Sequence, residues 1–210
     1  MPADKKRDIV NIIKNINNDP VVRAHEKRIN SLPPETQAKL SELSQKDPKE
    51  LQFRVIKRKR AYPQKGDVFV FSIQEAVYFY GKVLNNHINL QGDDLLLVAL
   101  FKSKTRSPDL AALDEIGTDL LLPPWVVGPE YWTRGYFFNV GLNDPSPLPY
   151  TYGFYHSMRR CFVDEYDNNL DYVPDYYTAR GVATDTGVSY AVQREVIIDP
   201  SLLKFDARGK

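Results

Sequence analysis

The residues of this chain that could do chemistry are few and widely spaced. The sequence contains one cysteine, Cys161, and three histidines, His25, His87 and His156. Zinc sites need Cys and His at short, regular spacings, and these four residues have no such spacing. Glycine-rich phosphate loops and dinucleotide fingerprints are missing as well. The sequence therefore predicts no metal and no cofactor.

The candidate nucleophiles and bases lack the partners that catalysis requires. Cys161 stands among apolar residues, which is typical of a small buried hydrophobe. His156 has no local motif that would complete a catalytic pair. Asp164 and Glu165 are adjacent, and adjacent strand residues point to opposite faces, so a shared acid–base site is geometrically awkward. We expect no catalytic residue set and interpret the chain as non-enzymatic.

Acidic and tyrosine side chains gather late in the chain instead. Such a surface suits a basic protein partner, because complementary charge speeds association and buried aromatic side chains slow release. Trp132 has two interpretations, an interface anchor or an ordinary member of the core. The predicted partner-binding residues are Asp164, Glu165, Asp167, Asp171, Asp175, Tyr176 and Trp132.

Two aromatic strands joined by a polar turn form the centre of the predicted fold. Ranges 65–73 and 76–84 are rich in β-branched and aromatic residues, which suit a pleated, half-buried surface. Both ranges are apolar on nearly every residue, so the sheet must be covered on both faces or keep one face for a partner. The N-terminal helices and the partner are both candidates for the cover.

Further strands are predicted along the later part of the chain. A polar loop over 85–94 precedes a strand at 95–101, and a short helix is expected from Ser107. Pro123 and Pro124 indicate an edge strand or an extended segment at 120–127. Gly135 indicates a bulge or a close backbone approach inside a predicted strand. The remaining predicted strands cover 131–140 and 160–163. Range 188–198 fits either a strand or a helix, and its Val and Ile content favours the strand.

The first 61 residues are predicted to be helical. Apolar residues at helical spacing favour a helix over 5–18, and weaker or shorter helices follow from Pro20, Pro34 and Pro48. Through Lys65 the charge balance is +8, and from Gly66 onward it is −7. This asymmetry predicts two modules, a helical segment at 1–61 and a β-rich domain at 62–210. The expected class is α+β, with a mainly antiparallel, strongly twisted sheet or a small barrel.

The basic run Lys57–Arg60 leaves an alternative open. Four consecutive cations can bind phosphates, and a small β-barrel beside them would fit a nucleic-acid-binding protein. The simpler interpretation is a solvated chain end, because no stacking aromatics are interleaved with the charges. Nucleic acid is therefore not the expected partner.

Length and composition place the chain among ordinary globular proteins. The hydrophobic fraction is 42%, which predicts a buried core, and the single Cys161 excludes an internal disulfide framework. The longest apolar runs are far shorter than the roughly 20 residues of a membrane-spanning helix. We therefore expect a cytoplasmic protein without a membrane partner. The sequence does not predict the oligomeric state.

Five short motifs, rich in aromatic residues and glycine, follow one another along the later part of the chain. They are Gly66-Asp67-Val68-Phe69, Tyr78-Phe79-Tyr80-Gly81-Lys82-Val83-Leu84, Trp132-Thr133-Arg134-Gly135-Tyr136-Phe137, Tyr152-Gly153-Phe154 and Val163-Asp164-Glu165-Tyr166. In this order they resemble the signature of the bacterial immunity protein 26 family over about residues 62–200. The resemblance implies a cytoplasmic antidote of a polymorphic or contact-dependent toxin system. Such a protein binds and neutralises a cognate secreted toxin domain, often a nuclease, in bacterial competition. The family implies no catalytic residues.

Overall fold

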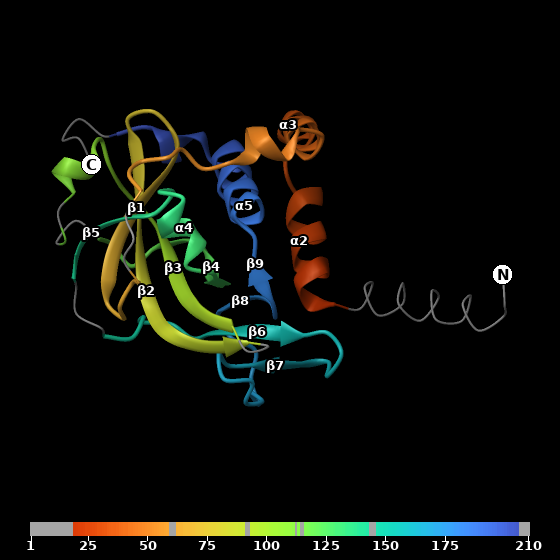
Figure 1. Cartoon of the computed structure of the whole chain (residues 1–210). Coiled ribbons are helices and arrows are strands. Elements are labelled where there is room, and N and C mark those ends of the chain that lie inside the picture. The colour runs from red at the N-terminus through yellow and green to blue at the C-terminus, as the bar shows by residue number, and fades with distance from the viewer. Residues whose placement is uncertain are drawn as a thin grey trace, which may run out of the picture.

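An open six-stranded sheet forms the body of the molecule in the computed structural model, which describes residues 19–58, 62–90, 93–111, 113, 116–142 and 146–205. Its strands are β1 (Asp67–Gln74), β2 (Val77–Leu90), β3 (Asp93–Thr105), β4 (Leu120–Val127), β5 (Phe138–Leu142) and β9 (Val182–Ala183). The order is β5-β1-β2-β3-β4-β9, and only β9 pairs parallel to its neighbour (Figure 1). The predicted α+β class is confirmed, and the sheet does not close into a barrel.

The predicted central hairpin is present as β1 and β2. Phe69 pairs with Gly81 in an antiparallel register. The prediction of a polar loop over 85–94 is wrong, because β2 continues to Leu90 and pairs with β3. Register breaks around Asn85 let the strand bend, and Ile88 is fully buried at its far end. Burial against the rest of the chain thus overrides the polar local sequence.

The two prolines of β4 lie at a break in the ladder with β3. Val98 pairs with Trp125 and Leu100 with Leu122, so the register shifts across Pro123 and Pro124. A proline cannot donate to a ladder and is therefore placed at edges or irregular points. The extended segment predicted at 120–127 is confirmed.

The strand predicted over 131–140 is wrong in its first half. A short helix, α4 (Glu130–Thr133), comes first, and β5 begins only at Phe138. Between them Gly135 adopts φ +83°, and a Cβ there would lie 2.9 Å from the backbone nitrogen of Arg58. The close backbone approach predicted at Gly135 is confirmed, and a side chain would block it.

The C-terminal segment predicted as a strand is a helix, α5 (Asp185–Ile198). Thr184 caps it, its Oγ1 accepting a hydrogen bond from the backbone N–H of Gly187 at 3.1 Å. Val188, Val192 and Glu195 are buried and recur at helical spacing. The Val and Ile content that favoured a strand was outweighed by this spacing and by the cap.

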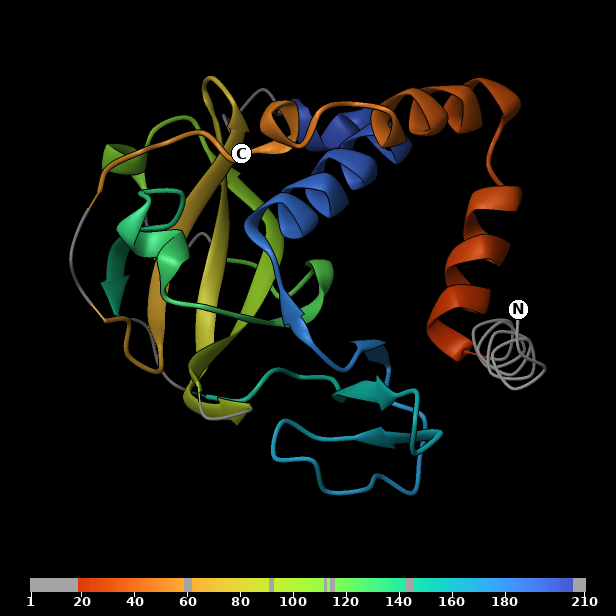
Figure 2. The ribbon, with the colours of Figure 1, turned by 45° about the vertical axis from the view of Figure 1, so that its right-hand side comes forward.

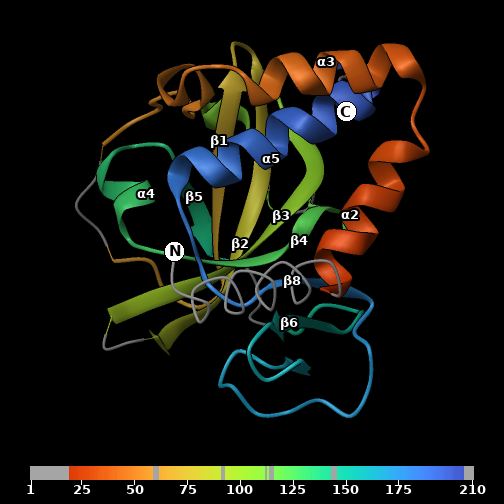
Figure 3. The same cartoon turned by 90° about the vertical axis from the view of Figure 1, so that its right-hand side faces the viewer.

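The chain itself covers both faces of the central strands. On one face α5 packs over a cluster that includes Phe69, Phe137 and Val192 (Figure 3). On the other face Tyr80 and Phe101 belong to a second cluster, flanked by later loop residues such as Leu148. Two short 3-10 helices, η2 (Pro108–Leu110) and η4 (Pro200–Leu203), follow β3 and α5 in the chain. The sequence left the N-terminal helices and the partner as candidates to cover the sheet. In the structure the sheet is covered chiefly by α5.

The N-terminal elements begin where the sequence predicts. They are α2 (Pro20–Asn30), α3 (Pro34–Ser44) and the 3-10 helix η1 (Pro48–Leu51). α3 packs against α5 with Leu40 and Leu43 buried, whereas α2 has no buried residue and runs from α3 toward the opposite end of the sheet (Figure 2). The helix predicted over 5–18 and the domain boundary at 61 lie outside the described residues.

Candidate partner-binding surface

A second sheet and the loop between two of its strands carry most of the predicted partner-binding residues. Its strands are β6 (Tyr152–His156), β7 (Cys161–Val163) and β8 (Tyr176–Ala179), in the order β7-β6-β8. We call it the small sheet. β8 is parallel to β6, so a long connection must return the chain. That connection is residues 164–175, here called the acidic loop. Both lie at the end of the molecule opposite α3 (Figure 2).

The two faces of the small sheet differ in burial. Phe154 and Val163 are fully buried against the main sheet. On the opposite, outer face the rings of Tyr155 and Tyr177 lie 5.4 and 5.0 Å from that of Phe162. These three side chains are only partly buried. The outer face therefore presents an aromatic cluster held in place by strand pairing.

The acidic loop carries a strong excess of negative charge. From Cys161 to Ala179 the sequence has five Asp or Glu residues and no Lys or Arg. Asp164, however, serves the loop itself. Its carboxylate accepts hydrogen bonds from the backbone N–H groups of Tyr166 and Asn168 at 2.8 and 2.9 Å. This arrangement is an Asx-type turn, so Asp164 shapes the loop.

Asp167 is fastened to the end of β8. Its carboxylate accepts from Arg180 Nε at 2.7 Å and from a terminal nitrogen at 3.1 Å. The Arg180 side chain is only 6% exposed, and its ring contact is with Phe154. The hydrogen bond from Arg180 lowers the pKa of Asp167 below its ordinary value. This ion pair locks the loop to the strand.

Asp175 likewise accepts hydrogen bonds from within the chain. It accepts from the backbone N–H and the hydroxyl of Thr151 at 2.9 and 2.8 Å. These bonds lower the pKa of Asp175, so its charge persists at neutral pH. The ring of the neighbouring Tyr176 contacts that of Tyr150 in a tilted arrangement, with centroids 4.7 Å apart. Both predicted residues lie where β8 begins.

Two predicted carboxylates keep capacity for a partner. Glu165 accepts one hydrogen bond, from the hydroxyl of Tyr152 at 3.2 Å. Burial and the Glu165 charge raise the pKa of Tyr152, so it stays a neutral donor. Asp171 is exposed and has no polar contact among the described residues. Beside Asp171, Tyr172 and Val173 are 46% and 66% exposed. An exposed apolar pair next to unused charge is typical of an interaction site.

Trp132 is the predicted residue that the structure places elsewhere. It is 3% exposed and contacts the rings of Phe69 and Phe137, each with centroids 5.1 Å away. Its indole N–H donates to Asn139 at 2.6 Å. Of the two interpretations open from sequence, the core position describes Trp132.

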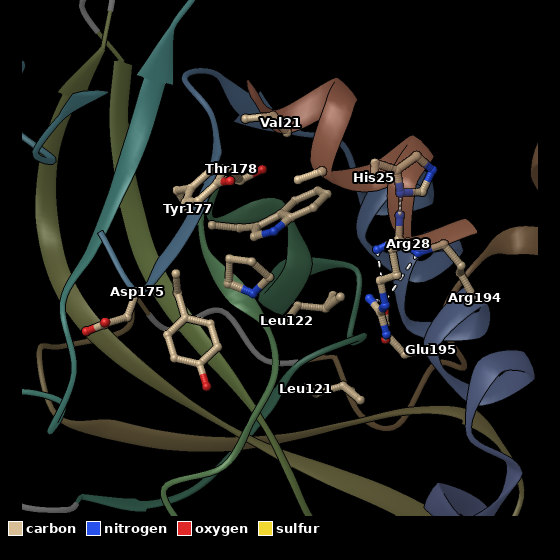
Figure 4. Close-up of a pocket in the computed structure, with 14 residues that line it drawn as sticks. Val21, His25, Arg28, Leu121, Leu122, Asp175, Tyr177, Thr178, Arg194 and Glu195 are labelled. Atoms are coloured by element: carbon tan, nitrogen blue, oxygen red, sulfur yellow. Dashed lines mark hydrogen bonds and ion pairs between the residues drawn. The ribbon is translucent and has the colours of Figure 1, made fainter. Parts of the chain in front are cut away.

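A pocket of about 450 Å³ adjoins the small sheet (Figure 4). Its apolar floor comes from β4, including Leu122 and Trp125. The indole N–H of Trp125 is buried and has no acceptor among the described residues. α2 forms one wall through side chains such as Val21 and Ala24. Asp175 and the start of β8, from Tyr176 to Thr178, form another.

Charged side chains of α2 and α5 close one end of this pocket. Arg28 forms two hydrogen bonds to Glu195, at 2.9 and 2.5 Å, and Arg194 adds another at 3.0 Å. Glu195 has an 8% exposed side chain. His25 lies 3.4 Å from Arg194, and burial together with the two arginines lowers the pKa of His25. His25 is therefore more often neutral there than in water.

Sequence reasoning missed the residues that assemble this region. Arg180 and Glu195 are far from their partners in the chain, and a single charge carries no local signature. The aromatic cluster of the outer face was present in the sequence as separate residues, and only strand pairing groups them. The helical spacing of 188–198 was the one signal that could have placed Glu195 and Arg194 on a helix.

Two classes of site are not found among the described residues. No group of three or more His, Cys, Asp or Glu side chains there is placed to hold a metal ion. No helix in the described part of the chain is long and apolar enough to cross a membrane.

One comparison with known proteins gives a match. Residues 64–156 match the family model described as immunity protein 26. The matched stretch runs from the turn before β1 through β6, and the acidic loop, β8 and α5 follow it in the chain. No curated protein and no solved structure matches the chain.

Proposed function

Because residues 64–156 match the immunity protein 26 family model, we propose that the chain binds and neutralises a cognate secreted toxin domain, and that this domain is a nuclease. In this proposal the chain acts in the cytoplasm of the toxin-producing cell, within a polymorphic or contact-dependent toxin system. It acts by occupying the toxin rather than by catalysis. The match to the family model supports the immunity role, and the acidic loop supports the choice of a nuclease.

The charge of the acidic loop is the observation that carries the nuclease proposal. A nuclease must attract phosphates, so its substrate surface is rich in Lys and Arg. Asp167 is paired with Arg180, while the hydrogen bonds of Asp164, Glu165 and Asp175 among the described residues are to backbone N–H groups, hydroxyls or an amide. A basic toxin surface would be steered toward this loop, and the bound chain would cover the surface that the nucleic acid needs.

The aromatic side chains supply the second part of the interface. Tyr172 and Val173 are exposed beside Asp171, and the outer cluster of Tyr155, Phe162 and Tyr177 lies on the same small sheet. Aromatic residues dominate interface hot spots when they are surrounded by contacts that exclude water. The surface therefore combines long-range attraction with side chains that slow dissociation.

Rescue by co-expression tests the proposal. The toxin domain of the secreted protein encoded by the adjacent gene would be expressed with and without this chain. We expect growth to stop with the toxin alone and to recover with the chain present. Purified toxin domain should lose its nuclease activity on adding one equivalent of the chain. Continued killing and continued cleavage in the presence of the chain would refute the proposal.

A charge-reversal pair tests the surface separately. The double variant Glu165→Lys, Asp171→Lys changes the two carboxylates that do not shape the loop. We expect the association rate at low salt to fall about tenfold, with a weaker dependence on ionic strength. The control pair, Glu42→Lys and Glu50→Lys, reverses exposed charges at the α3 end and should leave the rate within about twofold. Equal rates for the two pairs would remove the acidic loop from the interface.

A further inference from the structure

The pocket between α2, β4, β8 and α5 has the features of an anchor site for a peptide segment. Its volume of about 450 Å³ lies in the range of sites that bind small molecules or parts of peptides. Leu121, Leu122, Pro123 and Trp125 make its floor apolar. α2 lines it with Val21 and Ala24, yet α2 has no buried residue of its own. The described residues therefore leave apolar surface in this pocket uncovered.

The pocket is electrically polarised along its length. At one end two arginines, Arg28 and Arg194, face the single carboxylate of Glu195, so that end carries a net positive charge. At the other end Asp175 remains ionised because Thr151 holds its carboxylate. Figure 4 shows Asp175 on the opposite side of the pocket from Arg28, Arg194 and Glu195. An occupant with an acidic group at one end and a basic group at the other would match both.

β8 joins this pocket to the surface proposed for toxin binding. Tyr176 and Thr178 point to one face of β8 and Tyr177 to the other, because side chains alternate along a strand. All three line the pocket, and Tyr177 also belongs to the aromatic cluster of the outer face. A protein segment bound along the acidic loop would reach the pocket by following β8. A free small molecule would have no reason to require this continuity.

We infer that the pocket receives an extended segment of the toxin domain that carries a large apolar side chain between an acidic and a basic residue. The apolar side chain lies on Leu122 and Trp125, the acidic residue approaches Arg28 and Arg194, and the basic residue approaches Asp175. The buried indole N–H of Trp125 lacks an acceptor among the described residues, and a carbonyl of the inserted segment is a suitable one. This inference rests on the proposed function and assigns it a specific anchor.

Filling the pocket provides the test. Ala24→Trp places a large side chain from the exposed surface of α2 into the pocket, and Lys27→Trp places the same side chain on the same helix away from it. With the toxin domain encoded by the adjacent gene, we expect Ala24→Trp to raise the dissociation constant more than tenfold, as for the loss of a hot spot. Lys27→Trp should stay within about twofold. Circular dichroism and urea unfolding would show that both variants keep the fold.

The outcomes separate this inference from the proposed function. If Ala24→Trp binds the toxin like the unmodified chain, while Glu165→Lys, Asp171→Lys weakens binding, the anchor is refuted and the proposed function stands. If the unmodified chain neither binds nor protects, the proposed function fails and the anchor with it.

Two other occupants are tested with the same variants. The tryptophan fluorescence of the free chain would be titrated with 4-phenylbutyrate, a probe for an apolar carboxylate. Saturable binding of this probe, with toxin affinity unaffected by Ala24→Trp, would assign the pocket to a small molecule and overturn the inference. Sedimentation showing a dimer that Ala24→Trp dissociates, again with unchanged toxin affinity, would assign it to a second copy of the chain.

Discussion

Adding a single methyl group at Gly81 should measurably destabilise the fold. Gly81 faces Phe69 across the β1–β2 ladder, and a Cβ at Gly81 would lie 3.0 Å from Phe69 Cε1 and closer still to two other ring atoms. The ring of Phe69 is fully buried and stacks on Phe137 with centroids 4.4 Å apart. Trp132 also contacts the Phe69 ring, in a T-shaped arrangement with centroids 5.1 Å apart. The ring therefore has no free space into which it can move.

The magnitude follows from two opposing effects. Overpacking a filled core costs about 1–3 kcal/mol. Replacing glycine within a strand by alanine otherwise gains roughly 0.5–1 kcal/mol, because the unfolded chain loses conformational freedom. We therefore expect Gly81→Ala to lower the free energy of unfolding by about 1–2 kcal/mol. With a urea slope of about 2 kcal/mol/M, the unfolding midpoint would fall by roughly 0.5–1 M.

Urea unfolding of a double-mutant cycle checks this reasoning. Phe69→Leu removes the ring atoms that the new Cβ would meet, so adding Gly81→Ala to Phe69→Leu should cost less than about 0.5 kcal/mol. Gly181→Ala is the control, because a Cβ at Gly181 meets no atom within 4 Å. It should be neutral or slightly stabilising. A midpoint for Gly81→Ala equal to or above that of the unmodified chain would refute the steric argument.

Two further predictions concern protonation. Asp167→Asn removes the carboxylate paired with the buried Arg180 and should lower the free energy of unfolding at pH 7 by about 1–2 kcal/mol, a discounted figure because Asp167 is 41% exposed. Since its pKa is lowered in the fold, this contribution is present above about pH 4 and is lost as the pH falls through the lowered pKa. Unfolding midpoints from pH 2 to 7 test this, and the control Asp171→Asn, which keeps the Asp167–Arg180 pair, should keep the same pH-dependent loss as the unmodified chain. His25 has a lowered pKa in the fold, so below about pH 6.5 the unfolded chain takes up the proton first and stability declines. His25→Gln should reduce this decline in urea unfolding between pH 5 and 8, whereas His87→Gln retains His25 and should keep its contribution; equal slopes for His25→Gln and the unmodified chain would contradict the role of His25.

Local patterns predicted the elements that depend on neighbouring residues. Proline and capping signals located the starts of α2, α3 and η1, and the aromatic hairpin at 65–84 was recognised because strand propensity and turn chemistry agree there. The close backbone approach at Gly135 was also predicted from sequence, because glycine tolerates a contact that residues with a Cβ do not. The errors at 85–94 and 188–198 arose where contacts with distant strands and the core outweighed local composition.

The sequence by itself determined that the later part of the chain is acidic and aromatic, because charge and residue type do not depend on the fold. Only the tertiary structure decided which of those side chains are available. It holds the carboxylates of Asp164 and the exposed Asp175 on backbone N–H groups, pairs Asp167 with Arg180, and buries Trp132, while Glu165 and Asp171 keep capacity for a partner. It also brings Arg28, 167 positions away in the chain, onto Glu195 to close a pocket. Hydrogen bonds and ion pairs act over a few ångströms in space, and that proximity is fixed by the packing of α5 and the small sheet rather than by spacing along the chain.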